Sequence, residues 1–184
     1  GERILASLFS ATTARTAGFN SVDTGSLTSA SKLLTCVLMF IGGSPGSTAG
    51  GIKTTTIFIL VVSLWSGITD RHKTAVFKRR FEDDAIKKAS TVFTLNMFLA
   101  IFALFTILAI TDLSLSDVMF EVFSAIGTVG MTTGITRDLS SAARIIIMVL
   151  MFCGRVGSLS FALTFLQGKK DPPVYYPEEE ISVG

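Results

Sequence analysis

Three stretches of this 184-residue chain, residues 33–52, 54–69 and 91–111, contain no charged side chain. An apolar run of about 20 residues matches the hydrocarbon core of a lipid bilayer. Charged residues make up 16% of the chain, whereas an ordinary soluble domain contains about 25%. This pattern excludes a disordered chain, a disulfide scaffold and an ordinary cytosolic enzyme, and it predicts an all-α integral membrane protein.

Lysine and arginine are concentrated in two places, and these set the expected orientation. Residues 70–88 hold seven of them, and the tail begins with Lys169 and Lys170. Cytoplasmic loops of membrane proteins are enriched in these residues, so we expect both segments in the cytoplasm of a multi-pass protein of the cell membrane. Three crossings and two outer segments follow: spans ending near residue 68, at 91–111 and at 144–166, with residues 1–31 and 115–136 outside.

Several apolar segments are too short to cross the bilayer. As a helix, residues 1–13 would span about 20 Å of a core about 30 Å thick, and they form either a re-entrant half-helix or an ordinary amphipathic helix. Residues 116–127 are a second short segment, with Ser116 as the expected N-cap. Residues 32–43 and 54–68 are half-spans on either side of a loop rich in glycine, serine and threonine, which indicates a broken transmembrane helix.

The two outer segments are similar to each other. Each has a short apolar helix, a Thr-x-Gly tripeptide, a polar loop and then a long apolar helix broken near its middle. The two tripeptides with their next two residues can be superposed: Thr16, Ala17, Gly18, Phe19 and Asn20 on Thr128, Val129, Gly130, Met131 and Thr132.

These ten residues are the candidate ion-binding filter. Irregular backbone at membrane depth is tolerated where it lines a watery cavity, and rings of backbone carbonyls replace the hydration shell of potassium in channels. Glycine permits the backbone angles that aim carbonyls at an axis, threonine adds a hydroxyl, and the C-terminal end of a half-helix is attractive to a cation. We therefore expect K⁺ at these residues and at no other site. The alternative is two surface turns.

Three motifs extend this comparison to a known family: TARTAGFN at residues 13–20, GTVGMTTG at 127–134, and GGSPGSTAGGIKT at 42–54. With them, the chain resembles the Trk/Ktr/HKT superfamily of cation transporters, in particular the membrane subunit of Ktr potassium-uptake systems. In that family, four membrane–pore–membrane repeats with re-entrant pore helices surround one pore.

The resemblance implies a division of the chain into parts of that pore. Residues 1–68 would be the third pore unit without its first membrane helix, and residues 91–167 the complete fourth unit. A cytoplasmic linker at 69–90 joins them, and a cytoplasmic tail follows at 168–184. A missing N-terminal half would supply pore units one and two. The resemblance further implies a homodimer, a cytosolic nucleotide-binding regulatory ring as partner, and Na⁺ as a possible activator.

The loop between the two half-spans is the expected intramembrane gate. Its residues are Gly42, Gly43, Ser44, Pro45, Gly46, Ser47, Thr48, Ala49, Gly50 and Gly51. The stretch that begins at Gly46 resembles a phosphate-binding loop, but Ile52 stands where that motif requires lysine and the flanking segments are membrane helices. We therefore expect no nucleotide to be bound by this chain.

Arg155 lies near the middle of the last predicted span. A charged side chain there costs about 2.5–3.5 kcal/mol on the more lenient insertion scale, so it is a functional candidate. We expect it to face the pore near the loop, where it would repel permeant cations and act as part of the gate. The alternative is that the side chain snorkels to an interface.

The resulting hypothesis is a subunit that translocates potassium ions across the membrane. The alternative from another class is an assembly or anchor subunit without a pore. An enzyme is disfavoured because no catalytic set and no metal-ligand spacing is present, and a net charge of +2 does not suggest nucleic-acid binding.

Overall fold

The computed structural model describes residues 1–69, 75–76 and 79–157 of the chain. Helices make up almost all of the regular structure in this part, so the all-α prediction is confirmed. The elements are α1 (Glu2–Thr13), α2 (Ser29–Phe40), α3 (Thr54–Ile68), β1 (Ala75–Val76), β2 (Arg79–Arg80), α4 (Asp83–Ile110), α5 (Leu115–Ile126), the short 3-10 helix η1 (Ile135–Arg137) and α6 (Ser141–Val156). The predicted tail, residues 168–184, lies outside the described residues. The same holds for the end of the last predicted span, residues 158–166.

The helix α4 is the longest element, with 28 residues. Within the described residues, the segment Asp84–Ile110 alone is long and apolar enough to cross a membrane, judged by length and composition, with a mean hydropathy of 2.3. Several of its large apolar side chains are exposed: Phe98, Ile101, Phe102 and Phe105. Such a continuous apolar surface is typical of a helix that faces lipid or another chain.

The start of α4 differs from the sequence expectation. The helix begins at Asp83, eight residues before the predicted span at 91–111. The added turns contain acidic residues at the helix N-terminus, which the helix dipole favours, and further good helix formers. Apolar content marks the part of a helix that crosses lipid, and the helix itself continues through the charged residues beyond it.

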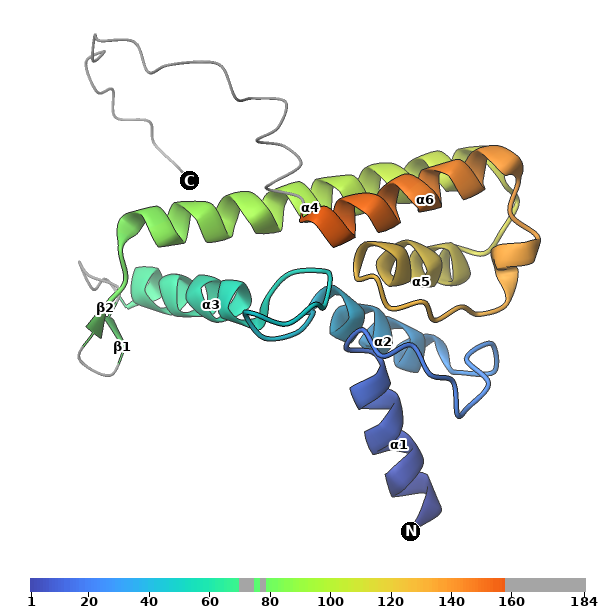
Figure 1. Ribbon diagram of the computed structural model, residues 1–184, viewed down its shortest axis with the longest axis horizontal. Helices are drawn as coiled ribbons and strands as arrows, with labels where there is room; N and C mark the ends of the chain where they lie inside the picture. The colour runs from blue at the N-terminus through green and yellow to red at the C-terminus, as the bar shows by residue number, and fades with distance from the viewer. Residues whose placement is uncertain (70–74, 77–78, 158–184) are drawn as a thin grey trace, which may run out of the picture.

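Helices α4, α5 and α6 pack together around one apolar core (Figure 1). Ile107 of α4, Val118 and Ile126 of α5, and Ala143 of α6 are all fully buried there. At Gly154 an added Cβ would lie 2.2 Å from the carbonyl oxygen of Ile126. The glycine therefore allows α6 to pass directly over the C-terminal end of α5.

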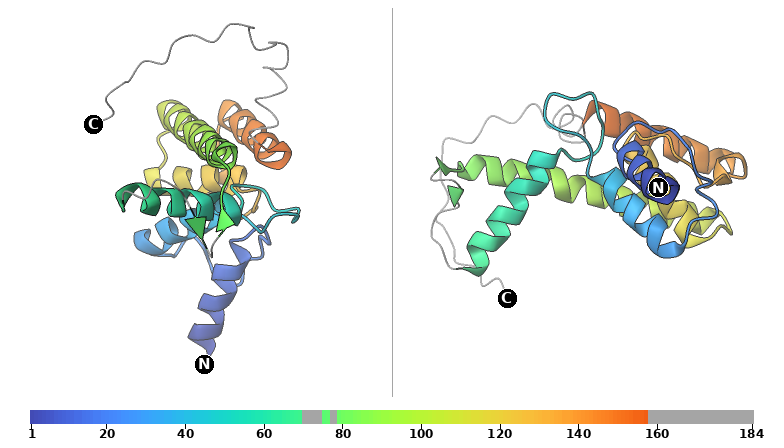
Figure 2. Two further views of the ribbon diagram at one scale, coloured as in Figure 1. Left: turned by 90° about the vertical axis from the view of Figure 1, so that its left-hand side faces the viewer. Right: turned by 90° about the horizontal axis from the view of Figure 1, so that it is seen from below.

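The helix is broken as predicted, but its first half, α2, begins and ends three residues before the predicted half-span at 32–43. α2 ends at Phe40, the loop follows, and α3 has the same bounds as the predicted second half-span. Seen from below, α2 and α3 run in clearly different directions on the two sides of the loop (Figure 2). A parallel bridge between Ile41 and Ile52 holds the two ends of the loop side by side.

The N-terminus of α5 is capped differently from the prediction. The cap is Ser114, whose hydroxyl accepts a hydrogen bond from the Asp117 amide at 3.2 Å, and Ser116 already lies inside the helix. Asp117 also forms an ion pair with Lys32 of α2, with 2.8 Å between Nζ and Oδ1. Both side chains are largely buried, so this pair joins the starts of α2 and α5.

We expect the Lys32–Asp117 pair to stabilise the packing of these two helices. Lys32→Met and Asp117→Asn each leave one polar partner unpaired and should lower the free energy of unfolding by about 1–3 kcal/mol. The double variant should lose less than the sum of the two, because it removes both partners. Thermal unfolding in detergent measures these changes, with Asp112→Asn as an exposed control. Additive losses in the double variant would contradict the coupling.

Candidate ion-permeation site

Two irregular loops meet near the centre of the molecule, one after α1 and the other after α5 (Figure 1). Each of these helices has 12 residues and directs its C-terminal end toward the meeting point. Ala14 of the first loop and Val129 and Met131 of the second share a buried cluster with side chains of α2 and α5. The helices thus bring together the two Thr-x-Gly motifs that lie 112 residues apart in the sequence.

The two motifs have the same pattern of backbone angles. Thr16 and Thr128 have positive φ values of 68° and 52°, and Gly18 and Gly130 have φ values of 73° and 85°. A positive φ is uncommon for a threonine, so its occurrence at both equivalent positions is structural evidence for the repeat. The sign of φ therefore alternates along each motif, so the two loops follow the same irregular backbone path.

The loops touch each other through their backbones. An added Cβ at Gly18 would lie 2.2 Å from the carbonyl oxygen of Val129, so no side chain fits between the two segments. The hydroxyl of Thr16 lies 3.4 Å from the carbonyl oxygen of Gly127, to which it donates a hydrogen bond.

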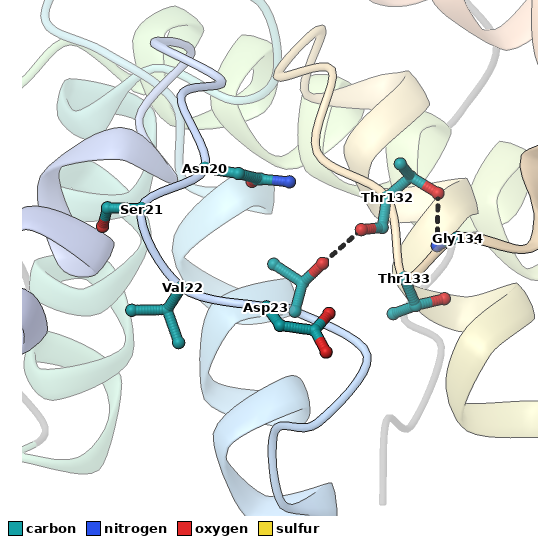
Figure 3. Close-up of a pocket in the computed structure, with 8 residues that line it drawn as sticks. Asn20, Ser21, Val22, Asp23, Thr132, Thr133 and Gly134 are labelled. Carbon is teal, nitrogen blue, oxygen red and sulfur yellow. Dashed lines mark hydrogen bonds between the residues drawn. The ribbon is translucent and has the colours of Figure 1, made fainter.

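At one end of this site lies a polar recess of about 400 Å³ (Figure 3). Across it, the Thr24 hydroxyl donates a hydrogen bond to the carbonyl oxygen of Thr132. On the first loop, the Thr13 hydroxyl accepts from the Phe19 amide at 2.7 Å and donates to the Phe19 carbonyl at 2.8 Å. Side-chain hydroxyls therefore hold the backbone of both loops just beyond the motif glycines.

At the other end of the second loop, the Thr128 hydroxyl has an unusual environment. It is buried and has no hydrogen-bond partner within the described part of the chain. Gly50 of the loop between α2 and α3 lies against it, since an added Cβ there would be 2.3 Å from this hydroxyl. A buried polar group without a partner is costly, and Gly50 covers this oxygen, so a ligand can reach it only when the loop between α2 and α3 moves.

The loop between α2 and α3 is held in a compact form by its own backbone. The Gly42 amide donates to the Ile52 carbonyl at 2.8 Å and the Thr54 amide to the Gly43 carbonyl at 3.2 Å. Pro45 and Gly46, the latter with a φ of 82°, occupy the central positions of a turn closed by the Ser47 amide and the Ser44 carbonyl. This is the sequence pattern of a type II turn.

Two cationic side chains bind three consecutive carbonyls at the tip of this loop. Arg155 of α6 donates from Nη1 to the Thr48 carbonyl at 2.5 Å. Lys53, directly after the loop, donates from Nζ to the carbonyls of Ser47 at 3.1 Å and Ala49 at 2.5 Å. The sequence suggested that Arg155 lies near the loop, and the contact agrees with this. The partners of Lys53 depend on the folded path of the loop and could not be found from the sequence.

The fold and the site together describe a helical membrane protein with two repeated, backbone-lined loops. Comparison with known proteins agrees: the family model TrkH, described as a cation transport protein, matches residues 1–171. The chain belongs to this family of transporters.

Individual relatives carry related names. Ktr system potassium uptake protein B of Bacillus subtilis is 37% identical over 183 residues, covering 100% of this chain and 41% of that protein. Potassium/sodium uptake protein NtpJ of Enterococcus hirae is 37% identical over 190 residues, covering 100% and 42%. The chain thus spans about two fifths of the length of these curated relatives.

A solved structure supports the fold. The potassium transporter TrkH from Vibrio parahaemolyticus superposes with a TM-score of 0.71 at 20% identity, over 89% of this chain and 36% of that one. At this level of identity the likeness concerns the fold alone.

The contact between the loops predicts unequal effects of alanine at the two motif glycines. Gly130→Ala has free space and should cost only the backbone strain of about 1–2 kcal/mol. Gly18→Ala adds a clash with the Val129 carbonyl and should cost about 1–3 kcal/mol more. Thermal unfolding in detergent distinguishes them, with Gly46→Ala, which also has positive φ and open space, as control. Equal losses at Gly18 and Gly130 would contradict the contact.

Proposed function

We propose that this chain forms half of a potassium-translocating pore in the cell membrane. Its two loops, with Thr16, Ala17, Gly18, Phe19 and Asn20 in one and Thr128, Val129, Gly130, Met131 and Thr132 in the other, are two of four filter segments. The observation that carries this proposal is the repeated backbone pattern, with positive φ at Thr16, Gly18, Thr128 and Gly130. Two unrelated surface turns would have no reason to share it or to be in direct backbone contact.

The chemistry of the loops suits a weakly hydrated cation. Backbone carbonyls replace water around potassium in known filters, and the Thr128 hydroxyl would supply a further oxygen at the inner end once the loop at 42–51 has moved away. The C-terminal ends of α1 and α5 add partial negative charge near the same place. The names of the relatives, which refer to potassium and to potassium/sodium uptake, support the same ion class.

In this proposal α1 and α5 are re-entrant pore helices. Each has 12 residues and is therefore about 18 Å long, which is shorter than the hydrocarbon core. The linker at 69–90 and the tail at 168–184 are cytoplasmic, because the first carries the main cluster of lysine and arginine and the second begins with two lysines. The filter then faces the outside and the loop at 42–51 lies on its cytoplasmic side.

The loop at 42–51 and Arg155 form the proposed gate. Three loop carbonyls bind Arg155 and Lys53, so the loop is held in place by two cations next to the inner end of the second filter segment. Positive charges at this position raise the barrier for a permeant cation. Release of these contacts would let the loop move away from Thr128.

The complete transporter requires other parts. The relatives are more than twice as long as this chain, and we propose that pore units one and two come from the unmatched part of such a protein. A homodimer in the lipid bilayer with a cytosolic nucleotide-binding regulatory ring is the proposed assembly, with the nucleotide on the ring and not on this chain. The name of the Enterococcus relative refers to uptake of sodium as well as potassium, and we propose sodium as an activator.

The experiment that tests the function is complementation. The chain is expressed with the unmatched part of the Bacillus subtilis relative in cells that lack potassium uptake. We expect growth on low potassium to be restored, and the chain alone should not restore it. Failure despite correct membrane insertion of both parts would favour the alternative, an assembly or anchor subunit that does not conduct.

Substitution of serine for the two filter glycines further distinguishes a pore subunit from an anchor subunit that does not conduct. Gly18→Ser and Gly130→Ser place a side chain on a residue with positive φ and displace the neighbouring carbonyls. In a filter, each change should lower the ratio of potassium to sodium uptake by about tenfold or more, an energy of about 1.4 kcal/mol. Isotope uptake into the complemented cells measures the ratio, with Gly67→Ser in α3 as a control in open space. An anchor subunit would tolerate both filter changes.

Removal of the charges that hold the loop should open the gate. Arg155→Ala and Lys53→Met each delete a contact to the loop and a positive charge. In liposomes that contain the complete transporter, each variant should increase potassium flux severalfold. Arg144→Ala is the matched control, because its guanidinium bonds the Arg137 carbonyl at the opposite end of α6. Unchanged flux in both gate variants would contradict the gating role.

A further inference from the structure

A carboxylate lies buried behind the second filter loop. Glu121, in the middle of α5, has only 6% of its surface exposed. Burial of a carboxylate is costly unless hydrogen bonds compensate for the lost water. Its Oε1 atom accepts hydrogen bonds from two hydroxyls, those of Thr132 and Thr136, the second at 2.8 Å. Glu121 is thus bound to the outer part of the loop that follows its own helix.

The bond to Thr132 orients this residue completely. The Thr132 hydroxyl donates to Glu121 and accepts from the Gly134 amide at 2.9 Å (Figure 3), and it lies 2.8 Å from the Thr136 hydroxyl. The carbonyl of Thr132 points the other way, toward the first loop, where it accepts from the Thr24 hydroxyl. A chain of polar contacts therefore runs from Glu121 through Thr132 to the opposite loop.

The loop needs such support because it has little regular structure. Residues 129–133 belong to no helix or strand, so side-chain bonds take the place of a backbone ladder. The Thr13 hydroxyl performs the corresponding task at Phe19 in the first loop, but there the supporting group is neutral and local. In the second loop the support is an acidic side chain 11 residues earlier in the sequence.

We infer that Glu121 is a positioning residue for ion selectivity. It acts through Thr132: by fixing the Thr132 side chain, it holds the outer end of the second filter segment and its contact with Thr24. Carbonyls that are free to move can close around the smaller sodium ion, so loss of the support lowers the preference for potassium. This inference rests on the proposed function of the two loops as a filter.

The test compares three variants in the complete transporter, in cells complemented as above. Glu121→Leu removes both acceptor bonds at similar volume and should lower the ratio of potassium to sodium uptake by tenfold or more. Glu121→Gln keeps a carbonyl acceptor in the same place and should change the ratio less than threefold. Asp138→Asn, an exposed carboxylate after η1, is the matched control and should leave the ratio unchanged.

A fourth variant covers the case in which Glu121→Leu is not inserted. Thr136→Val removes one of the two hydroxyls bound to Glu121 at an exposed position outside the filter, and it should lower the ratio two- to threefold at normal membrane abundance. A wild-type ratio in Glu121→Leu or, failing its insertion, in Thr136→Val would overturn the inference. Equal losses in Glu121→Gln and Glu121→Leu would also overturn it, because the charge and not the hydrogen bonds would then be responsible. Failure of the unmodified chain, expressed with the unmatched part, to restore potassium uptake would instead contradict the proposed function.

Discussion

Direct contact between backbone segments, with no side chain between them, is the constraint on which this structure depends. Gly18 lies against the Val129 carbonyl, Gly127 against the Met39 carbonyl of α2, and Gly154 against the Ile126 carbonyl. Each contact joins two different segments, and together they connect the two loops, the broken helix and α6. Large apolar side chains are exposed on α1, α3, α4 and α6, whereas those of α5 are mostly buried in the core.

In the proposed function, the filter and the gate are neighbours. The loop at 42–51 reaches the second of the two repeated loops at Thr128, because an added Cβ at Gly50 would lie 2.3 Å from the Thr128 hydroxyl. Movement of the loop therefore changes the surroundings of the second filter segment directly. Two cations and one buried carboxylate, which are Lys53, Arg155 and Glu121, hold these irregular segments in place.

Much of the fold could be predicted because apolar length and glycine content are local properties. The bounds of α3, the break after α2 and the two short helices followed from them. The starts of α4 and α5 could not be predicted as well. α4 continues through charged residues that any solvated helix accepts, and the α5 cap is Ser114 because its hydroxyl, rather than that of Ser116, reaches the Asp117 amide.

For the candidate site, the sequence indicated the positions of the filter and the loop, whose roles remain proposals. The two Thr-x-Gly motifs were recognisable because the repeat preserves residue types, and Arg155 was recognisable because charge is rare in an apolar span. Lysine, glutamate and threonine are common residues, so Lys53, Glu121 and Thr24 could not be recognised from the sequence. Their roles depend on contacts that the folded paths of the loops create: with the Ala49 carbonyl, the Thr132 hydroxyl and the Thr132 carbonyl, respectively.

The central claim is that the two loops bind one line of ions. The most direct measurement is anomalous X-ray scattering from thallium ions, which substitute for potassium, in crystals of the complete transporter. The account predicts thallium peaks between residues 16–18 and residues 128–130. Thallium bound elsewhere in the protein, with no peak between these two segments, would contradict it.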